Sequence, residues 1–354
     1  MENIINRKKF LRISAISAAV LGGGALVGKG IFDAVTSAKE YSESRSMMGT
    51  RVEIKLVDNS TSVAKEAVAQ VFSEMTRLAA VFSRFNPQTE LAVLNASGRL
   101  DNASAELLEV LAQAKEFGAL TDGVFDVSIL PAINLMETHF AEQRLKKSQD
   151  SNYIIAPPSD QAFAAVLPLV NYENIIIDGN NISLAKEGMQ ITLDGIAKGY
   201  IVDKASAKLT ALGYTDVLID GGGDIAVSGV NQKAEDWQIG ITHPRALAGY
   251  YAITSINSGA IATSGDYEVP NSYTNDYTYH HIINPKTARW SDLASASVWA
   301  PSCTLADILA TACMALGGEK GLELVESIDG AECLLIKKDM SHLRSVNFSV
   351  SEII

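Results

Sequence analysis

An oxygen pair on one predicted helix is the first hint of chemistry in this sequence. In the segment TLADILAT, Asp307 and Thr311 are four residues apart and therefore share one face of the helix. A carboxylate and a hydroxyl are hard oxygen donors that suit Mg²⁺, an ion that also binds substrate phosphates. Without further context, such a pair is more often a helix cap or part of a solvated face.

Glycine-rich segments could bring backbone amides close to an anion. LDGIAKGY, residues 193–200, opens a predicted helix, so its amides could face a diphosphate and Lys198 could neutralise the charge, unless Lys198 is simply solvated. DGGGD, residues 220–224, could approach an anion or a flat ring, or could be a tight structural turn. TDGVFD at 121–126 and ATSGDYE at 262–268 have a similar mixture of glycine, hydroxyl and carboxylate.

His281 is the best candidate for a general base among the five histidines. It lies in the segment HHIINP, between strand-like sequence and a proline turn. A histidine side chain ordinarily titrates near neutral pH, which is what a base for a hydroxyl group requires. A single histidine is more often structural, so the segment alone leaves both interpretations open.

Regular elements must position these residues. Alternating apolar residues predict a strand at 51–57, helical spacing predicts a helix through 68–82, and Ser104 is a plausible N-cap of a second helix. The polar stretch 137–159 predicts a surface loop or insertion. Further helices are expected at 196–212, 305–316 and 321–327, and further strands at 175–178, 182–184, 217–219, 237–241, 253–256, 297–300 and 333–336. This mixture without a strict βαβ order favours an α+β or mixed α/β domain.

Composition limits the classes of function. Apolar residues make up 47% and charged residues 20% of the 354-residue chain, as in a globular protein. The formal net charge of -12 argues against binding to nucleic acid or anionic lipid. Cys303, Cys313 and Cys333 lack the spacing of a disulfide framework or a zinc site, so we expect them to be small core residues.

The N-terminus predicts export. RKKFLR at 7–12 precedes an apolar, glycine-rich run at 13–27, the pattern of a signal peptide over residues 1–38, followed by a linker at 39–46. RKKFLR resembles a twin-arginine signal, but Lys8 replaces the second arginine, which leaves the export route open. An uncleaved anchor helix with membrane association is the alternative. Either way we expect the protein in the periplasm or at the outer face of the inner membrane.

In their residues and their order along the chain, these segments resemble the ApbE family, the FAD:protein FMN transferases, from Met48 nearly to the C-terminus. The matching stretches are MGT at 48–50, FSRFNPQTELAVLN at 82–95, TDGVFD, GIAKGYIVD at 195–203, GGDI at 222–225, ATSGDYE, HIINP and ADILAT. The resemblance implies an ApbE-like, T-fold-like domain over residues 47–354, with mixed sheets and packed helices. It also implies Mg²⁺-dependent transfer of the FMN part of FAD to a threonine or serine of another protein, with release of AMP.

The resemblance assigns roles to individual residues. It makes Asp307, Thr311 and the backbone carbonyl of Gly195 the metal ligands, and His281 the candidate base for the acceptor hydroxyl. The residues that would line the FAD site are Met48, Phe85, Val124, Phe125, Asp126, Thr192, Lys198 and Ile282. Acceptors in the family are flavin-carrying subunits of redox pumps and exported reductases.

The sequence departs from the family pattern near the expected FAD site. Phe85 stands where a tyrosine against the flavin is usual, Asp194 replaces a usual glycine, and Thr192 replaces a frequent aspartate. Asp220 precedes the glycines in place of asparagine or leucine. The carboxylate of Asp194 could repel phosphate or help to hold a second metal.

Two other functions remain compatible with the sequence. The same metal site could hydrolyse FAD to FMN and AMP with water as the acceptor. A flavin carrier outside the cytoplasm would bind FAD without releasing AMP, although the intact ADILAT pair argues against it.

Overall fold

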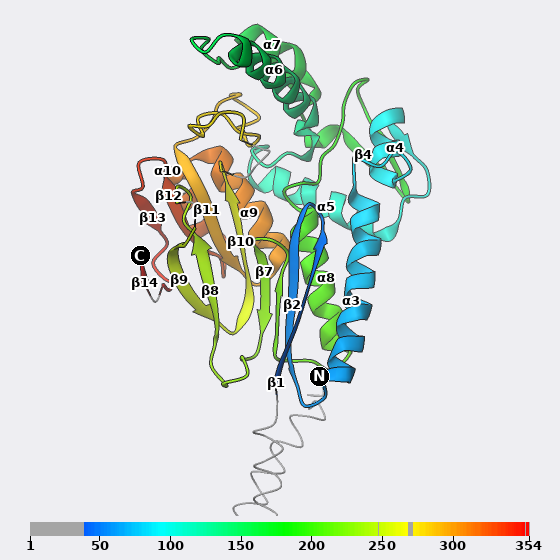
Figure 1. The fold of residues 1–354 in the computed structure, drawn as a ribbon. Helices are drawn as coiled ribbons and strands as arrows, with labels where there is room; N and C mark the ends of the chain where they lie inside the picture. Colours follow the sequence, from blue (N-terminus) through cyan, green and yellow to red (C-terminus); the bar gives the residue numbers. More distant parts are fainter. Residues whose placement is uncertain (1–38, 247, 268–271, 351, 354) are drawn as a thin grey trace, which may run out of the picture.

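The computed structural model describes residues 39–246, 248–267, 272–350 and 352–353. Its centre is an eight-stranded antiparallel sheet in the order β1-β2-β6-β7-β10-β11-β12-β13 (Figure 1). These strands are β1 (Lys39–Met47), β2 (Thr50–Asp58), β6 (Val217–Asp220), β7 (Asp224–Ser228), β10 (Ser258–Gly265), β11 (Leu293–Ala300), β12 (Glu332–Lys337) and β13 (His342–Arg344).

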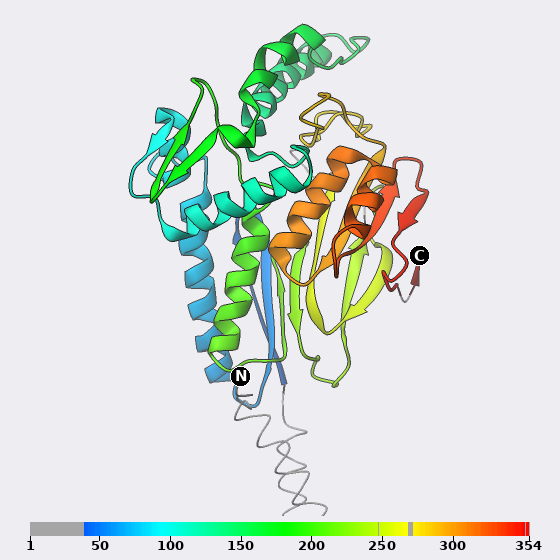
Figure 2. The same ribbon diagram turned by 180° about the vertical axis from the view of Figure 1, so that it is seen from behind.

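Helices cover one face of this sheet (Figure 2). They are α3 (Thr61–Phe82), α8 (Ala197–Ala211), α9 (Cys303–Leu316) and α10 (Gly318–Glu326). α3 buries one apolar stripe against Val52, Ile54 and Leu56 of β2, as its helical spacing of apolar residues requires. α9 is buried on nearly all sides, because α8 and α10 flank it and β10 and β11 lie beneath it.

A three-stranded sheet covers the opposite face. Its strands are β8 (Trp237–Thr242), β9 (Tyr250–Ile256) and β14 (Glu352–Ile353), in the order β14-β9-β8. Trp237 and Ile239 of β8 pack on Leu218 and Ile261 of the large sheet. The molecule therefore has three layers, with helices on one side of the central sheet and the small sheet on the other (Figures 1 and 2).

A helical region stands above one end of the central sheet (Figure 1). Its elements are α4 (Glu90–Ser97), α5 (Ala105–Leu120), α6 (Leu130–Gln149), α7 (Asp160–Val166), the short strands β3 (Arg99–Leu100), β4 (Ile175–Asp178) and β5 (Asn181–Leu184), and the 3-10 helices η1 (Val127–Ile129), η2 (Leu167–Leu169) and η3 (Tyr172–Asn174). α6 and α7 pack on each other and project from the body; we refer to residues 130–166 as the α6–α7 arm.

Most of the predicted elements are confirmed. The strand at 51–57 is β2, the helix at 196–212 is α8, and Ser104 caps α5 by accepting a hydrogen bond from the backbone of Leu107. All three cysteines are buried and free, as expected for core residues. None of the described helices is both long enough and apolar enough to cross a lipid bilayer. The predicted leader, residues 1–38, lies outside the described residues.

Two predictions about local structure are wrong. Residues 39–46, expected to be a linker, belong to β1, which pairs with β2 along its whole length. β1 is an edge strand with mostly polar side chains, so it lacks the apolar alternation of a half-buried strand. Residues 137–149, expected to be loop, complete α6, which is rich in strong helix formers but polar around most of its outer part.

Reciprocal hydrogen bonds join helices α8 and α9 near their N-termini. Asp203 of α8 accepts hydrogen bonds from the backbone amides of Cys303 and Thr304 at 2.8 Å each, and from the Thr304 hydroxyl at 2.6 Å. In return, Asp307 of α9 accepts a hydrogen bond from the amide of Gly199, in the first turn of α8, at 3.1 Å. Each helix thus satisfies amide groups that the other leaves without an intrahelical partner.

Glycine at position 199 makes this contact possible. A Cβ atom there would lie 2.4 Å from the carbonyl oxygen of Cys303 and 2.9 Å from Cβ of Asp307. No side chain can be accommodated at such distances unless the two helices move apart. The close approach of α8 and α9 therefore depends on the second glycine of GIAKG.

We predict that Asp203→Ala lowers the free energy of unfolding by about 1–3 kcal/mol, because three donors at the start of α9 lose their acceptor. Chemical denaturation of the folded chain would measure this. Asp203→Asn is the matched control: it keeps one acceptor oxygen and should lose less stability. Equal losses for the two variants would contradict a capping role.

Candidate active site

The candidate segments gather at one end of the central sheet. The turn between β1 and β2, the glycine loop between β6 and β7, and the end of β10 lie together there because their strands are neighbours and antiparallel. The N-terminus of α8 faces the same end, next to α9 (Figure 1). The fold thus brings together stretches of sequence more than 200 residues apart.

The residues predicted to bind the metal lie together where α8 and α9 meet. Gly195 lies so close to Thr311 that a Cβ on the glycine would be 2.8 Å from the Thr311 Oγ1 atom. Ser264, at the end of β10, places its hydroxyl 3.3 Å from the same atom. Asp307, one helical turn before Thr311, is only 3% exposed. This mixed set of hydroxyl, carboxylate and backbone oxygens is chemically suited to Mg²⁺.

Carboxylate or histidine clusters offer no alternative metal site in the described ranges. Among those residues, no three side chains of His, Cys, Asp or Glu gather in a way that could hold a metal ion. A metal at the α8–α9 contact would therefore need the backbone and hydroxyl oxygens as well as Asp307.

Lys198 lies in the first turn of α8 and forms an ion pair with a buried carboxylate. Its Nζ atom is 3.2 Å from Oδ2 of Asp224, whose side chain is 2% exposed. Burial raises the pKa of the Asp224 carboxyl, and the positive charge of Lys198 acts in the opposite direction. Lys198 is thus fixed beside the metal-ligand candidates by a carboxylate to which the sequence assigned no role.

Phe85 and Asp194 are linked through Arg84. The Phe85 ring is 76% exposed, and the guanidinium carbon of Arg84 lies 4.2 Å above its centre. Arg84 also donates a hydrogen bond from Nε to Asp194 at 3.3 Å. The carboxylate that departs from the family pattern is therefore paired with a cation, which offsets its repulsion of phosphate. An exposed ring held from one side can stack on a flat ligand with the other.

The TDGVFD segment forms the wall of the site rather than a set of free ligands. Asp126 is buried and accepts hydrogen bonds from the Ser128 amide at 2.8 Å, the Ser128 hydroxyl at 2.6 Å and the Tyr172 amide at 2.9 Å. Phe125 belongs to the main core. Thr192 joins this wall through its amide, which donates to the carbonyl of Val127 at 2.8 Å. The Asp126 carboxylate therefore fixes the shape of the loop. A contact of this segment with FAD would come from its backbone.

Met48 occupies the turn between β1 and β2 with a positive φ of 53°, which is uncommon for a residue with a side chain. The following Thr50 contacts the glycine loop: a Cβ on Gly222 would lie 2.2 Å from its Oγ1. Gly222 itself has a φ of 83°. The DGGGD segment is thus a tight turn, which was one of its two predicted roles. It also adjoins the site, because Asp224 pairs with Lys198.

Ile282 reaches the site from a segment without regular structure, and His281 is its neighbour in the chain. Ile282 packs in one apolar cluster with Val124 and with Leu309 of α9, so it lies beside the metal-ligand helix. His281 is partly exposed and directly precedes it in the chain. The preceding His280 is fully buried.

Three residues near the site received no role from the sequence. Asp224 pairs with Lys198, Ser264 contacts Thr311, and Asp203 caps α9. All three lie inside the family-like stretches GGDI, ATSGDYE and GIAKGYIVD. Their position in these stretches was the available signal, but their partners are far away in the sequence.

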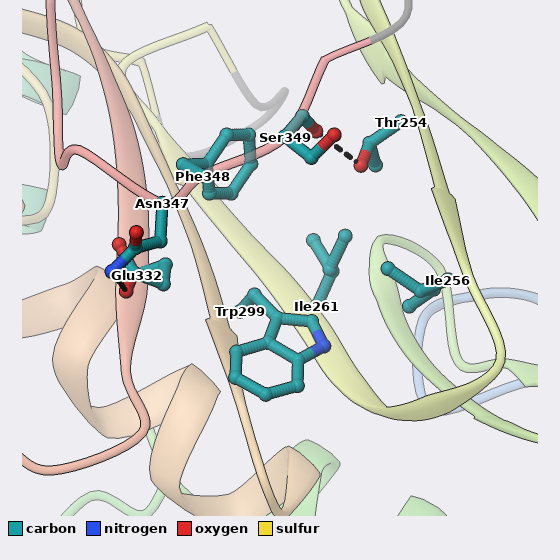
Figure 3. A pocket seen from close by; sticks show the side chains of 8 residues that line it. All are labelled: Thr254, Ile256, Ile261, Trp299, Glu332, Asn347, Phe348 and Ser349. Carbon is teal, nitrogen blue, oxygen red and sulfur yellow. Dashed lines mark hydrogen bonds between the residues drawn. The ribbon is translucent and has the colours of Figure 1, made fainter.

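Two cavities lie on the side of the sheet that faces β8 and β9. A cavity of about 180 Å³ is lined by Gly222, Gly223, Thr242, Thr263 and Tyr267, among others, and adjoins the glycine loop. A cavity of about 220 Å³ is lined by the apolar side chains of Ile256, Ile261, Trp299 and Phe348 and by the polar residues Thr254, Glu332, Asn347 and Ser349 (Figure 3). None of its lining residues is a predicted site residue, so it is separate from the candidate active site.

We predict that Gly195→Ala weakens Mg²⁺ binding at least tenfold, because the added methyl group would press on the Thr311 hydroxyl. Isothermal titration calorimetry with Mg²⁺ measures the affinity, and thermal unfolding without metal reports whether the fold is kept. An unchanged affinity in a folded variant would argue against Gly195 and Thr311 as parts of one metal site.

We further predict that His280 makes stability depend on pH. In the part of the chain that the structure describes, neither of its ring nitrogens has a hydrogen-bond partner. Burial lowers its pKa well below 6.5, and the charges of His281, Lys338 and Arg245 act in the same direction. The unfolded chain therefore binds a proton near pH 6.5 that the folded chain does not, so stability falls as the pH decreases below that value.

The test is the Tm between pH 7 and pH 5. In His280→Leu the decrease in Tm on acidification should be smaller than in the wild type. Identical decreases would show that other groups cause the acid sensitivity.

Comparison with known proteins agrees with this arrangement. The model of the ApbE family matches residues 48–335. The FAD:protein FMN transferase of Haemophilus influenzae is 29% identical over 314 residues, which are 85% of this chain and 88% of that protein. That of Treponema pallidum is 28% identical over 356 residues, covering 93% and 92%.

Solved structures show the same fold. The flavin transferase ApbE from Vibrio cholerae superimposes with a TM-score of 0.69 at 27% identity, covering 88% of this chain and 98% of that one. The ApbE protein of Thermotoga maritima gives a TM-score of 0.71 at 25% identity, with the same coverage. The family match spans most of the sequence and includes the residues that converge between α8 and α9. The chain is therefore a member of the ApbE family.

Proposed function

We propose that this protein transfers the FMN part of FAD to a threonine or serine hydroxyl of an acceptor protein, with Mg²⁺, and releases AMP. The observation that carries the proposal is the convergence of Asp307, Thr311 and Gly195 beside Lys198 and the N-terminus of α8. The names of its relatives support the reaction class: those of Haemophilus influenzae and Treponema pallidum are FAD:protein FMN transferases.

The arrangement suits a diphosphate. The first turn of α8 carries partial positive charge from its amide groups, and Lys198 adds a full charge in the same turn. Asp307, Thr311 and Gly195 would hold Mg²⁺. The bound ion would neutralise the charge that develops on the diphosphate. The exposed ring of Phe85, fixed by Arg84, would stack on the isoalloxazine of FAD.

The chemical step is a displacement at the phosphorus on the FMN side. A bond forms between the acceptor oxygen and this phosphorus, and the bond from the phosphorus to the oxygen of AMP breaks. His281 would take the proton of the attacking hydroxyl. Positioning and charge stabilisation supply most of the rate in such reactions, so a rigid contact between α8 and α9 matters more than covalent chemistry by the protein.

We further propose that the reaction takes place outside the cytoplasm, with residues 1–38 as an export signal or an anchor. The basic segment at 7–12 and the apolar run at 13–27 support this. The acceptor would then be an exported protein or an exported domain, such as a flavin-carrying subunit of a redox pump or a reductase.

The test is to mix the chain lacking residues 1–38 with FAD, Mg²⁺ and a candidate acceptor domain, and to follow acceptor mass and AMP together. We predict a gain of one FMN on the acceptor, abolished by a chelator. Asp307→Asn should lower the rate at least about a hundredfold, because it removes a metal-binding charge but retains an oxygen that can accept from Gly199. Asp329→Asn, at an exposed turn, is the matched control and should leave the rate unchanged.

Each other outcome has a definite meaning. AMP release with several unmodified acceptors would make the protein an FAD hydrolase. FAD binding without AMP release would make it a flavin carrier. Full activity of Asp307→Asn would show that this carboxylate is not needed to bind the metal.

A further inference from the structure

The segment that carries the candidate base has no regular structure of its own. We call residues 272–290 the histidine segment; it contains His280 and His281. Its described backbone pairing comprises the isolated bridges Ser272 to His280 and Asn284 to Arg289 and a few hydrogen bonds inside the segment, such as that from the Tyr273 amide to the Tyr279 carbonyl. These described backbone pairs all lie within the segment, so its attachment to the rest of the molecule depends on side chains. They are a different set from the contacts that hold the metal-ligand helices.

Trp290 makes the most direct of these contacts. Its indole Nε1 donates a hydrogen bond of 2.6 Å to the carbonyl oxygen of His280. That carbonyl belongs to the peptide group that joins His280 to His281. Because a peptide group is planar, fixing its oxygen also fixes the direction in which the chain enters His281.

The Trp290 ring is in turn held by the α6–α7 arm. It packs edge-on against Phe140 of α6 and Phe163 of α7, with ring centres 6.3 and 6.5 Å apart. It also contacts Tyr279 at 4.8 Å. Phe140 stacks on Tyr273 at 4.7 Å with an interplanar angle of 13°. The arm and the histidine segment thus share one aromatic cluster.

The other side of the histidine segment is also attached. Lys338, just after β12, donates a hydrogen bond of 3.4 Å to the carbonyl of Thr278. Arg245 lies 4.6 Å over the ring of Tyr277 and forms two hydrogen bonds of 2.7 Å with the buried Asp266. Tyr273, Tyr279 and Trp290 therefore all join the segment to the arm, while its opposite side is fixed to the body. Of these three rings, Trp290 is the one that also binds the peptide group before His281.

We propose that Trp290 is a positioning residue for His281, through which the α6–α7 arm maintains the geometry of the base. The inference depends on the proposed function, in which His281 accepts the proton of the acceptor hydroxyl. A base is sensitive to small displacements: a shift of about 1 Å can reduce a rate about a hundredfold. A single neutral hydrogen bond contributes little to global stability by comparison.

The chain contains a matched control for this contact. Trp299 also donates an indole hydrogen bond to a carbonyl, that of Ser258, at 3.2 Å. Its ring lies in the cavity that is separate from the candidate active site (Figure 3). Trp290→Phe and Trp299→Phe each remove one indole–carbonyl hydrogen bond and keep an aromatic ring, but only the first changes the histidine segment.

The experiment measures kcat and KM for FAD with a fixed acceptor, together with Tm. We expect Trp290→Phe to lower kcat about tenfold, with KM for FAD unchanged. Trp299→Phe should keep the wild-type kcat, with a similar change in Tm. In a His281→Ala background, Trp290→Phe should cause no further loss, because the two residues act through one group.

The outcomes separate this inference from the proposed function. If the wild type transfers no FMN to any acceptor, the proposed function fails, and the role of Trp290 fails with it. If the wild type is active but Trp290→Phe resembles Trp299→Phe in kcat, the positioning role alone is wrong. A further tenfold loss in the His281→Ala background would also overturn it, because the effect would then not pass through His281.

Discussion

The close contact between α8 and α9 is the constraint on which the rest of the site depends. Two carboxylates, Asp203 and Asp307, each bind amide groups at the start of the other helix, and Gly199 leaves the space for this. Asp307 consequently serves the packing of the helices and the predicted metal site with the same side chain. A displacement of Asp307 would therefore also break the hydrogen bond that joins the two helices.

Elements with a strong apolar pattern were predictable from the sequence, and elements without one were not. α3 and β2 bury regular apolar positions, so their spacing identified them. β10 consists mainly of small residues and glycine, and β1 is polar at the sheet edge, so tertiary pairing rather than local preference makes them strands. The outer part of α6 is polar because it projects from the body of the molecule.

The candidate site was predictable as a set of segments but not as a set of contacts. Resemblance to the family named Asp307, Thr311, Gly195 and Lys198, and the fold brings these four together. The partners of Lys198 and Thr311 come from β7 and β10, and no local pattern connects them. Asp194, a departure from the family, has Arg84 as a counter-ion. The two residues are far apart in the sequence, so this pairing could not be predicted from it.

The course of β1 determines how the enzyme would face its surroundings. The strand begins with Lys39 and ends with Met47, next to the turn at the site end of the sheet. Nine extended residues span about 30 Å. If residues 1–38 attach the protein to the membrane, as the anchor alternative has it, β1 is a rigid spacer. The site end of the sheet would then be separated from Lys39, where β1 begins, by the length of this strand, about 30 Å.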